Sequence, residues 1–252
     1  MFYIALLLPF IIFPIIWSIP RFKPKVFVVG LNKTGTTSLG DALATLGYKR
    51  LGWKDLLSRK LFHDWYSGNL QHLIGLSRTY DAFEDLPWTF LYEEMATMYP
   101  DAKFILTLRN DEEKWWRSIH AHTNRNGWVG HELLYGSQFA NESNKETYVS
   151  IYRSHNDRVR EFFKDQPHRL LELRIDNGLR WEELCEFLGK KNIPKTAFPR
   201  SNPKDKWSNV DHLKIFWVWG KFVNWVETLL VTWLYYAGKL PGHPALARIE
   251  TS

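Results

Sequence analysis

Cysteine is nearly absent from this sequence, since Cys185 is the only one among 252 residues. A single cysteine excludes any disulfide within the chain, which fits a reducing compartment. Internal repeats and low-complexity segments are absent too, and no group of histidines has the spacing of metal ligands. The sequence therefore gives no sign of a disulfide scaffold, a repeat protein or a metalloenzyme.

Runs rich in lysine and arginine are also lacking, although the net charge is +6 and the pI is near 9.2. Without such a run or an aromatic recognition motif, nucleic acid is not an expected partner. The positive charge suits an anionic ligand or a membrane surface instead. Hydrophobic content of 45% with 24% charged residues is typical of a folded protein.

The most informative stretch is residues 25–39, KVFVVGLNKTGTTSL. Four β-branched or aromatic residues (26–29) predict a buried parallel strand, and a Gly/Thr-rich turn leads into a helical segment. The N–H groups and hydroxyls of Thr36, Thr37 and Ser38 would then lie at a helix N-terminus, where an anion is stabilised. This layout predicts a phosphate-binding loop.

The lysine of this loop, Lys33, does not stand at the position that lysine has in the loop of nucleotide hydrolases. Their loop reads G-x-x-x-x-G-K-[ST], with lysine directly after the second glycine. Gly30 and Gly35 have that spacing, but Thr36 occupies the lysine position and Lys33 precedes the glycine. The displacement favours a different phosphate chemistry.

Both ends of the chain are apolar. Residues 2–19 carry no charge and are long enough, as a helix, to cross a bilayer, with Arg21, Lys23 and Lys25 following on the expected cytoplasmic side. We therefore expect a single-pass anchor over residues 1–20, with a cleaved signal peptide as the alternative. Residues 210–252 are rich in tryptophan with one polar face, which predicts a helix at the membrane interface or one packed on the domain.

Between these ends, over residues 21–209, strand-like and helical segments alternate. We expect strands near 26–29, 80–84, 103–108 and 170–175, with helices near 36–46, 87–99, 111–122, 145–164 and 181–188. Such alternation predicts an α/β fold, with a parallel sheet flanked by helices on both faces. Ligands of these sheets bind at the carboxyl ends of the strands.

The motifs K-T-G-T-T after a strand, residues 80–119 (YDAFEDLPWTFLYEEMATMYPDAKFILTLRNDEEKWWRSI) and the later RLLELRIDNGLRWEELCEFLG resemble a sulfotransferase-like branch of P-loop proteins that is frequent in fungi. The resemblance covers about residues 25–207. It implies 3′-phosphoadenosine 5′-phosphosulfate (PAPS) as sulfuryl donor and no required metal. Asn32, Lys33, Thr34, Gly35, Thr36, Thr37 and Ser38 would hold the 5′-phosphosulfate, with Lys33 on the bridging oxygen.

In sulfotransferases an Arg/Ser pair holds the 3′-phosphate of the donor, and the resemblance assigns this role to Arg109 and Ser118. A guanidinium offers phosphate a bidentate fork, and a hydroxyl adds a donor. Two departures stand out, since the pair is nine residues apart instead of eight, and Asn110 and Asp111 replace Asp-Pro. Arg117 is an alternative for part of the contact, and a surface ion pair is the alternative for Arg109.

Transfer to an alcohol also needs a group that accepts the hydroxyl proton. The family pattern Asp-x-Pro matches Asp85-Leu86-Pro87, which makes Asp85 the expected base and Glu84 the second candidate. The competing interpretation of Asp85 is a helix N-cap before Pro87. His63 and Asp64 are further candidates.

The expected function is therefore a membrane-anchored, PAPS-dependent sulfotransferase. Its expected acceptor is a small, lipophilic alcohol or phenol, and its domain would face the cytosol. Two other functions stay open, a small-molecule kinase or nucleotide hydrolase, and a non-catalytic membrane protein that retains the fold.

Overall fold

A computed structural model of the chain describes residues 23–201 together with residue 226. Its centre is a five-stranded sheet in the order β2-β3-β1-β4-β5. The strands are β1 (Val26–Val28), β2 (Arg50–Leu51), β3 (Ala82–Phe83), β4 (Lys103–Leu108) and β5 (Leu170–Arg174). Every neighbouring pair is parallel, so the carboxyl ends of all five strands share one edge.

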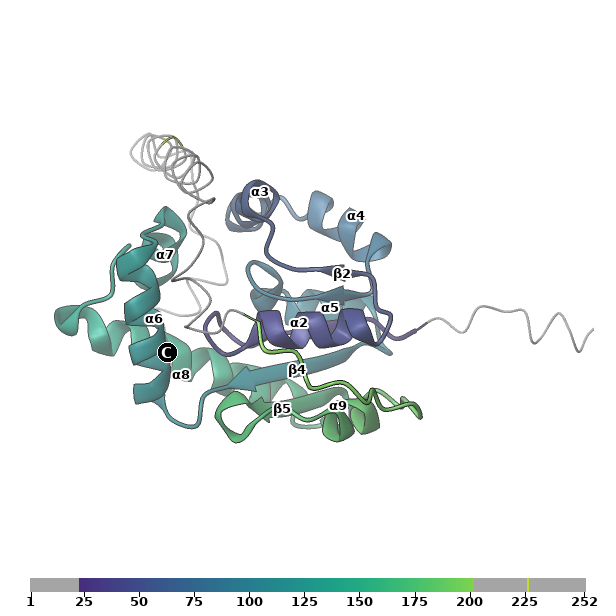
Figure 1. The fold of residues 1–252 in the computed structure, drawn as a ribbon. Coiled ribbons are helices and arrows are strands. Elements are labelled where there is room, and N and C mark those ends of the chain that lie inside the picture. The colour runs from purple at the N-terminus through teal and green to yellow at the C-terminus, as the bar shows by residue number, and fades with distance from the viewer. Residues whose placement is uncertain (1–22, 202–225, 227–252) are drawn as a thin grey trace, which may run out of the picture.

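Helices cover both faces of this sheet (Figure 1). The α-helices are α2 (Thr36–Thr45), α3 (Asp55–Tyr66), α4 (Gln71–Thr79), α5 (Tyr92–Met98), α6 (Glu112–Arg125), α7 (Val129–Tyr135), α8 (Lys145–Phe163) and α9 (Trp181–Phe187). Short 3-10 helices are η1 (Trp88–Phe90), η2 (Glu142–Asn144), η3 (Pro167–Arg169) and η4 (Ile175–Asn177). The predicted parallel α/β fold is confirmed.

Two hydrophobic cores lie on opposite faces of the sheet, because successive strand residues point to opposite sides. On one face, Val26 and Val28 pack with buried residues of α2 and α9. On the other, the ring of Phe27 stacks on those of Phe83 and Phe104 at centroid distances of 4.7 and 5.4 Å, and Phe104 contacts Phe163 of α8. These contacts fix the relative positions of the three central strands.

The four predicted strands are present, and β2 is an addition to the prediction. It pairs Arg50 with Ala82 and Leu51 with Phe83, and two residues are too short for a periodic signal. Helices α3, α4 and α7 were likewise not predicted. In Figure 1 the arrow of β4 points toward the side on which α6 and α7 lie, so these helices extend the molecule beyond the carboxyl edge.

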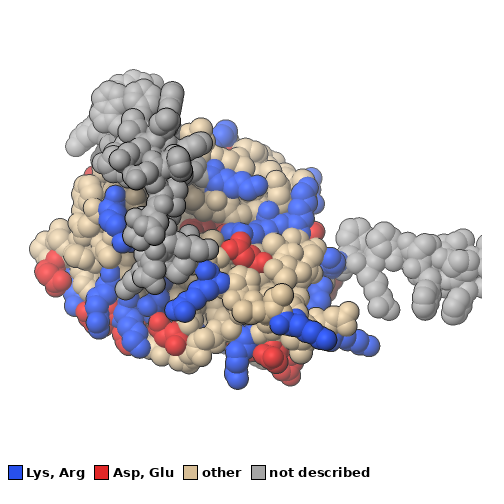
Figure 2. Space-filling model, in the orientation of Figure 1, with Lys and Arg blue, Asp and Glu red and all other residues tan. Residues whose placement is uncertain are grey.

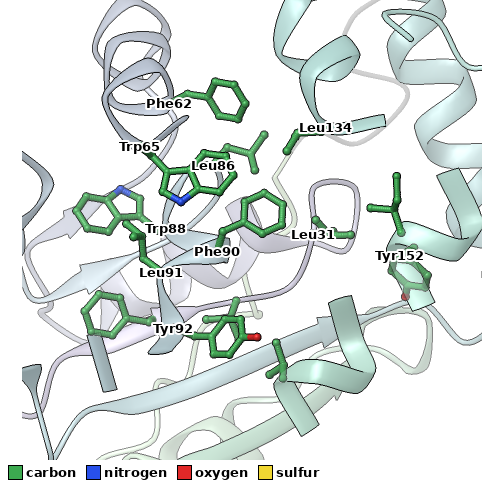
Figure 3. Close-up of a cluster of buried hydrophobic side chains, with 14 of the residues drawn as sticks. Leu31, Phe62, Trp65, Leu86, Trp88, Phe90, Leu91, Tyr92, Leu134 and Tyr152 are labelled. Carbon is green, nitrogen blue, oxygen red and sulfur yellow. The ribbon is translucent and has the colours of Figure 1, made fainter. Parts of the chain in front are cut away.

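The helix expected over 87–99 is wrong in its first half. Residues 88–90 form η1, and the α-helix begins only at Tyr92. The reason is burial, since Trp88 and Phe90 both lie in the core, and Phe90 stacks on Trp65 of α3 at 4.9 Å (Figure 3). An amphipathic helix would turn part of this segment toward solvent.

The expected anchor over residues 1–20 lies outside the described residues, as does the aromatic segment 210–252 apart from residue 226. In the part of the chain that the structure describes, no helix has the length and apolar character needed to cross a membrane.

Candidate functional site

The loop between β1 and α2 has the backbone of an anion-binding turn. Lys33 and Gly35 both have left-handed conformations, with φ angles of 68° and 89°. Helix α2 follows at once, and no side chain caps its N-terminus. Its first N–H groups and the positive end of its dipole are therefore available to an anion.

The loop is held close to β4. A Cβ atom at Gly30 would lie 2.1 Å from the Oγ1 atom of Thr107, so only glycine fits there. The hydroxyl of Thr34 is buried, donates to the carbonyl of Leu31 and lies 2.7 Å from the hydroxyl of Thr107. The Thr34 side chain therefore holds the shape of the loop, and the backbone N–H of Thr34 is left for a ligand.

Asn32 ties the loop to α6 and α7. Its carbonyl accepts a hydrogen bond from the indole N–H of Trp115 at 3.1 Å, and its Oδ1 atom accepts one from the Tyr135 hydroxyl at 3.1 Å. Asn32 is itself buried. Among the predicted donor-binding residues, it acts in this structure as a support of the loop.

Lys33 lies among other charged groups at this edge. Burial lowers its pKa, and the charges of Arg125 and Arg109 lower it further, while Asp85 opposes them. These interactions show that three cations and one carboxylate converge near the loop. An anionic ligand would relieve the repulsion among the cations.

Lys and Arg side chains are also spread widely over the face of the molecule shown in Figure 2, where acidic side chains form only small groups.

Glu84 is enclosed in an ion-pair network below the loop. It is 1% exposed and pairs with Arg50, which also pairs with Asp41 of α2. Its second oxygen, Oε2, is buried without a hydrogen-bond partner. Burial and the neighbouring Asp85 raise the pKa of Glu84, although Arg50 opposes this. A Cβ atom at Gly52 would lie 2.0 Å from the Glu84 carboxylate, so little space surrounds it.

Asp85 has different surroundings from Glu84. Its backbone is left-handed, with φ of 69°, and its carboxylate accepts a hydrogen bond from its own neighbour, the Leu86 N–H, at 2.8 Å. It does not cap η1, whose N-cap is Pro87 without a side-chain bond, so the N-cap interpretation is wrong. Burial raises the pKa of Asp85, and the Leu86 N–H, Lys33 and Arg50 oppose the rise.

Arg109 stands directly after β4, as predicted. Its N–H donates to the Tyr152 hydroxyl of α8 at 3.1 Å, and its Nη2 atom pairs with Asp176 Oδ1 of η4 at 3.1 Å. Its Nε atom is buried without a hydrogen-bond partner. The guanidinium is therefore anchored at the site edge with part of its donor capacity unused.

Ser118 lies on α6, which Asp111 caps by accepting from the Lys114 N–H at 2.7 Å. Trp115, one turn earlier on the same side of α6, donates to the loop. Ser118 therefore lies on the loop side of the helix, although within residues 23–201 no hydrogen bond joins it to Arg109. Arg117 pairs with Glu113 and its side chain is 70% exposed, which places it on the surface.

Ser38 and Thr37 complete the first turn of α2. The Ser38 hydroxyl accepts a hydrogen bond from the Ser201 N–H at 3.0 Å, so the last residue of the described range 23–201 lies beside this helix. Thr37 is half-buried. The structure thus gathers the predicted residues 32–38, 84, 85, 109 and 118 around one edge of the sheet.

His63 and Asp64 belong to α3. Asp64 binds Lys60 at 2.7 Å and His72 of α4 at 3.1 Å, which is a contact between two helices. The ring of His63 contacts that of Phe62 at 6.3 Å. The contact between Asp64 and His72 ties α3 to α4.

Sequence reasoning missed His122 and Arg125, which follow Ser118 on α6. Burial, Lys33 and Arg125 lower the pKa of His122 to about 4, so its ring is neutral near pH 7. The ring contacts that of His131 on α7 at a centroid distance of 5.7 Å. Helical spacing from Trp115 (i+7) was the available signal, because it places His122 on the loop side of α6.

No group of three or more His, Cys, Asp or Glu side chains able to hold a metal ion occurs within residues 23–201 or at residue 226.

The sequence that forms this site is similar to those of known proteins. A family model described as a sulfotransferase domain matches residues 25–207. The chain is also similar to Ava biosynthesis cluster protein M of Aspergillus versicolor, with 27% identity over 234 residues, covering 77% of this chain and 86% of that protein. The matched residues include the loop, the β3 and β4 ends and α6. The chain belongs to the sulfotransferase family.

Proposed function

We propose that the protein transfers a sulfuryl group from PAPS to a hydroxyl group of a small acceptor. The observation that carries this proposal is the convergence of Lys33, the uncapped start of α2, Asp85 and Arg109 at one sheet edge. The 5′-phosphosulfate would bind the N–H groups of the loop and of α2. The 3′-phosphate would bind Arg109, with Ser118 as a second donor.

In the proposed reaction the acceptor oxygen attacks sulfur in line with the bridging oxygen of the donor. The new bond joins the acceptor oxygen to sulfur, and the bond from sulfur to the bridging phosphate oxygen breaks. Adenosine 3′,5′-bisphosphate leaves, and Lys33 stabilises the charge that develops on its 5′-phosphate. Asp85 takes the hydroxyl proton, since Glu84 is enclosed by Arg50 and the glycines around it.

The acceptor we propose is a lipophilic alcohol or phenol. We also propose that the enzyme is anchored in a membrane, with its catalytic domain facing the cytosol. The support is the apolar character of residues 2–19 and the tryptophan-rich segment after residue 210. A relative named for a biosynthesis cluster also fits a small-molecule acceptor.

The main rival function is a small-molecule kinase or nucleotide hydrolase. Thr36 stands where those enzymes carry lysine, which speaks against this function. The other rival is a non-catalytic membrane protein that retains the fold, which the altered Arg109 to Ser118 spacing favours.

Thermal melting of the full chain in detergent separates these functions. Adenosine 3′,5′-bisphosphate at a hundred times its dissociation constant should stabilise the protein by about 2.7 kcal/mol. The shift should disappear in Lys33→Ala and in Arg109→Ala, and persist in Lys164→Ala, a control on the exposed end of α8. A shift with ATP-Mg alone would favour the kinase, and a shift with neither ligand would favour the non-catalytic protein.

A further inference from the structure

The turn η4 connects the two halves of the proposed donor site. Its first residue, Ile175, lies against the loop, because a Cβ atom at Gly35 would come within 2.7 Å of the Ile175 Cγ2 atom. Its second residue, Asp176, contacts Arg109 and Asn110 at the end of β4. A residue of this turn can therefore act on both the loop side and the Arg109 side of a bound donor.

The Asp176 carboxylate uses both of its oxygens at the end of β4. Oδ1 lies 3.1 Å from Nη2 of Arg109, and Oδ2 accepts from the Asn110 N–H at 2.8 Å. The ion pair is partly shielded from water, since the two side chains are 23% and 17% exposed. Its electrostatic effect is therefore stronger than that of a pair on the open surface.

Asp176 pairs with the Nη2 atom of Arg109, and this choice of nitrogen affects how Arg109 can bind a phosphate. A guanidinium binds a phosphate with two parallel N–H groups, either Nε with Nη2 or Nη1 with Nη2. Both edges include Nη2, which is the nitrogen paired with Asp176. The Nε atom beside it has no partner. A phosphate that binds Arg109 through two N–H groups must therefore displace Asp176 from Nη2 or bind Nη2 together with it.

The backbone of Arg109 does not depend on this ion pair. The Tyr152 hydroxyl holds its N–H, and the Arg174 side chain donates to its carbonyl at 3.0 Å. Release of Asp176 would thus free the guanidinium without moving the strand end.

We propose that Asp176 is a specificity-determining residue of the donor site, whose carboxylate competes with the 3′-phosphate of the nucleotide for Nη2 of Arg109. This inference rests on the proposed function, since it takes Arg109 as the 3′-phosphate ligand. The carboxylate neutralises part of the guanidinium charge and repels an approaching phosphate. It thereby limits the affinity for the donor and for the bisphosphate product, but not for nucleotides that lack a 3′-phosphate.

Asp176→Asn tests the competition, since it keeps a hydrogen-bond acceptor for the Asn110 N–H and removes the charge. Calorimetric titration should show about tenfold tighter binding of adenosine 3′,5′-bisphosphate, with AMP binding changed by less than about twofold. The matched control is Glu172→Gln, which removes the same charge from β5 at the Arg160 pair. It should leave both affinities within about twofold of the wild type.

A second set of variants keeps the inference falsifiable. In an Arg109→Ala background, Asp176→Asn should have no further effect on bisphosphate binding, because no guanidinium remains to be released. Unchanged or weaker bisphosphate binding by Asp176→Asn, in protein whose unliganded melting temperature is that of the wild type, would overturn the competition. A wild type that binds the bisphosphate no better than AMP would overturn the donor assignment itself, and the inference with it.

Discussion

At the scale of single residues, the two neighbouring carboxylates after β3 have different surroundings, which suit them to different roles. Glu84 pairs with Arg50 inside the molecule, whereas Asp85 lies near the Lys33 charge. Burial raises the pKa of both groups. One residue is therefore suited to hold the structure together and the other to exchange a proton.

Asp85→Asn should lower the turnover number by a factor of about 100 to 10,000, because an amide cannot accept the proton of the acceptor hydroxyl. Binding of adenosine 3′,5′-bisphosphate should stay within about threefold of the wild type. In the wild type, activity should be lost on acidification at a higher pH than for an ordinary aspartate, since the pKa of Asp85 is raised. A turnover number unchanged in the variant would show that another group is the base.

Glu84→Gln should instead act on stability, lowering the free energy of unfolding by about 2 kcal/mol, because the Arg50 charge loses its buried partner. Chemical denaturation measures the effect. Asp157→Asn, which removes an exposed partner of Arg160, should cost less than about 0.5 kcal/mol. Equal losses in the two variants would contradict the role assigned to Glu84.

At the scale of elements, the loop depends on how closely β1 and β4 approach each other. The Cβ position of Gly30 coincides with the side chain and backbone of Thr107, at distances from 2.1 to 2.8 Å. Backbone atoms cannot swing away as the end of a long side chain can. The position of Lys33 therefore follows from the packing of two strands that are distant in sequence.

Gly30→Ala should destabilise the protein by about 3 kcal/mol and abolish bisphosphate binding, since β1 and β4 must separate to admit the methyl group. Gly75→Ala is the matched control, because Gly75 lies within α4 with no atom within 4 Å of its Cβ position. This control should raise stability by about 0.5 to 1 kcal/mol. Melting temperatures and bisphosphate titration check both variants, and a stable, ligand-binding Gly30→Ala would refute this account.

At the scale of the whole molecule, buried neutral histidines connect stability to pH. Burial lowers the pKa of His155 and of His122 to about 4 and that of His131 to about 3. The His155 ring holds the β1 end, 2.7 Å from the Val29 carbonyl. Since the folded state prefers these rings neutral, acid favours the unfolded chain, in which they bind protons more readily.

The free energy of unfolding should accordingly fall as the pH drops from about 6.5 to about 4, with His155 contributing about 3 kcal/mol. The raised pKa values of Glu84 and Asp85 act in the opposite sense, favouring the folded state as those carboxylates take up protons. Melting temperatures across this pH range test the balance. His155→Gln should flatten the dependence, His168→Asn on the exposed η3 should not, and a flat wild-type profile would contradict the prediction.

Much of the site was predictable where local pattern decides it. The loop, the strand ends that carry Asp85 and Arg109, and the Asp111 cap of α6 follow from residue types within a few positions of one another. Helix α7 and the short strand β2 have no comparable local signal. His122 was missed because its importance depends on the loop that α6 faces.

The sequence alone determined the fold class and the backbone character of the loop, because hydrophobic periodicity and a glycine-threonine turn act over short distances. Tertiary structure decided which carboxylate is enclosed and which cations surround Lys33. It also decided that Asp176 forms an ion pair with Arg109. Such choices depend on contacts like that between Asn110 and Asp176, which are 66 positions apart. Burial and charge act through space, so their effect on a site appears only when the chain is folded.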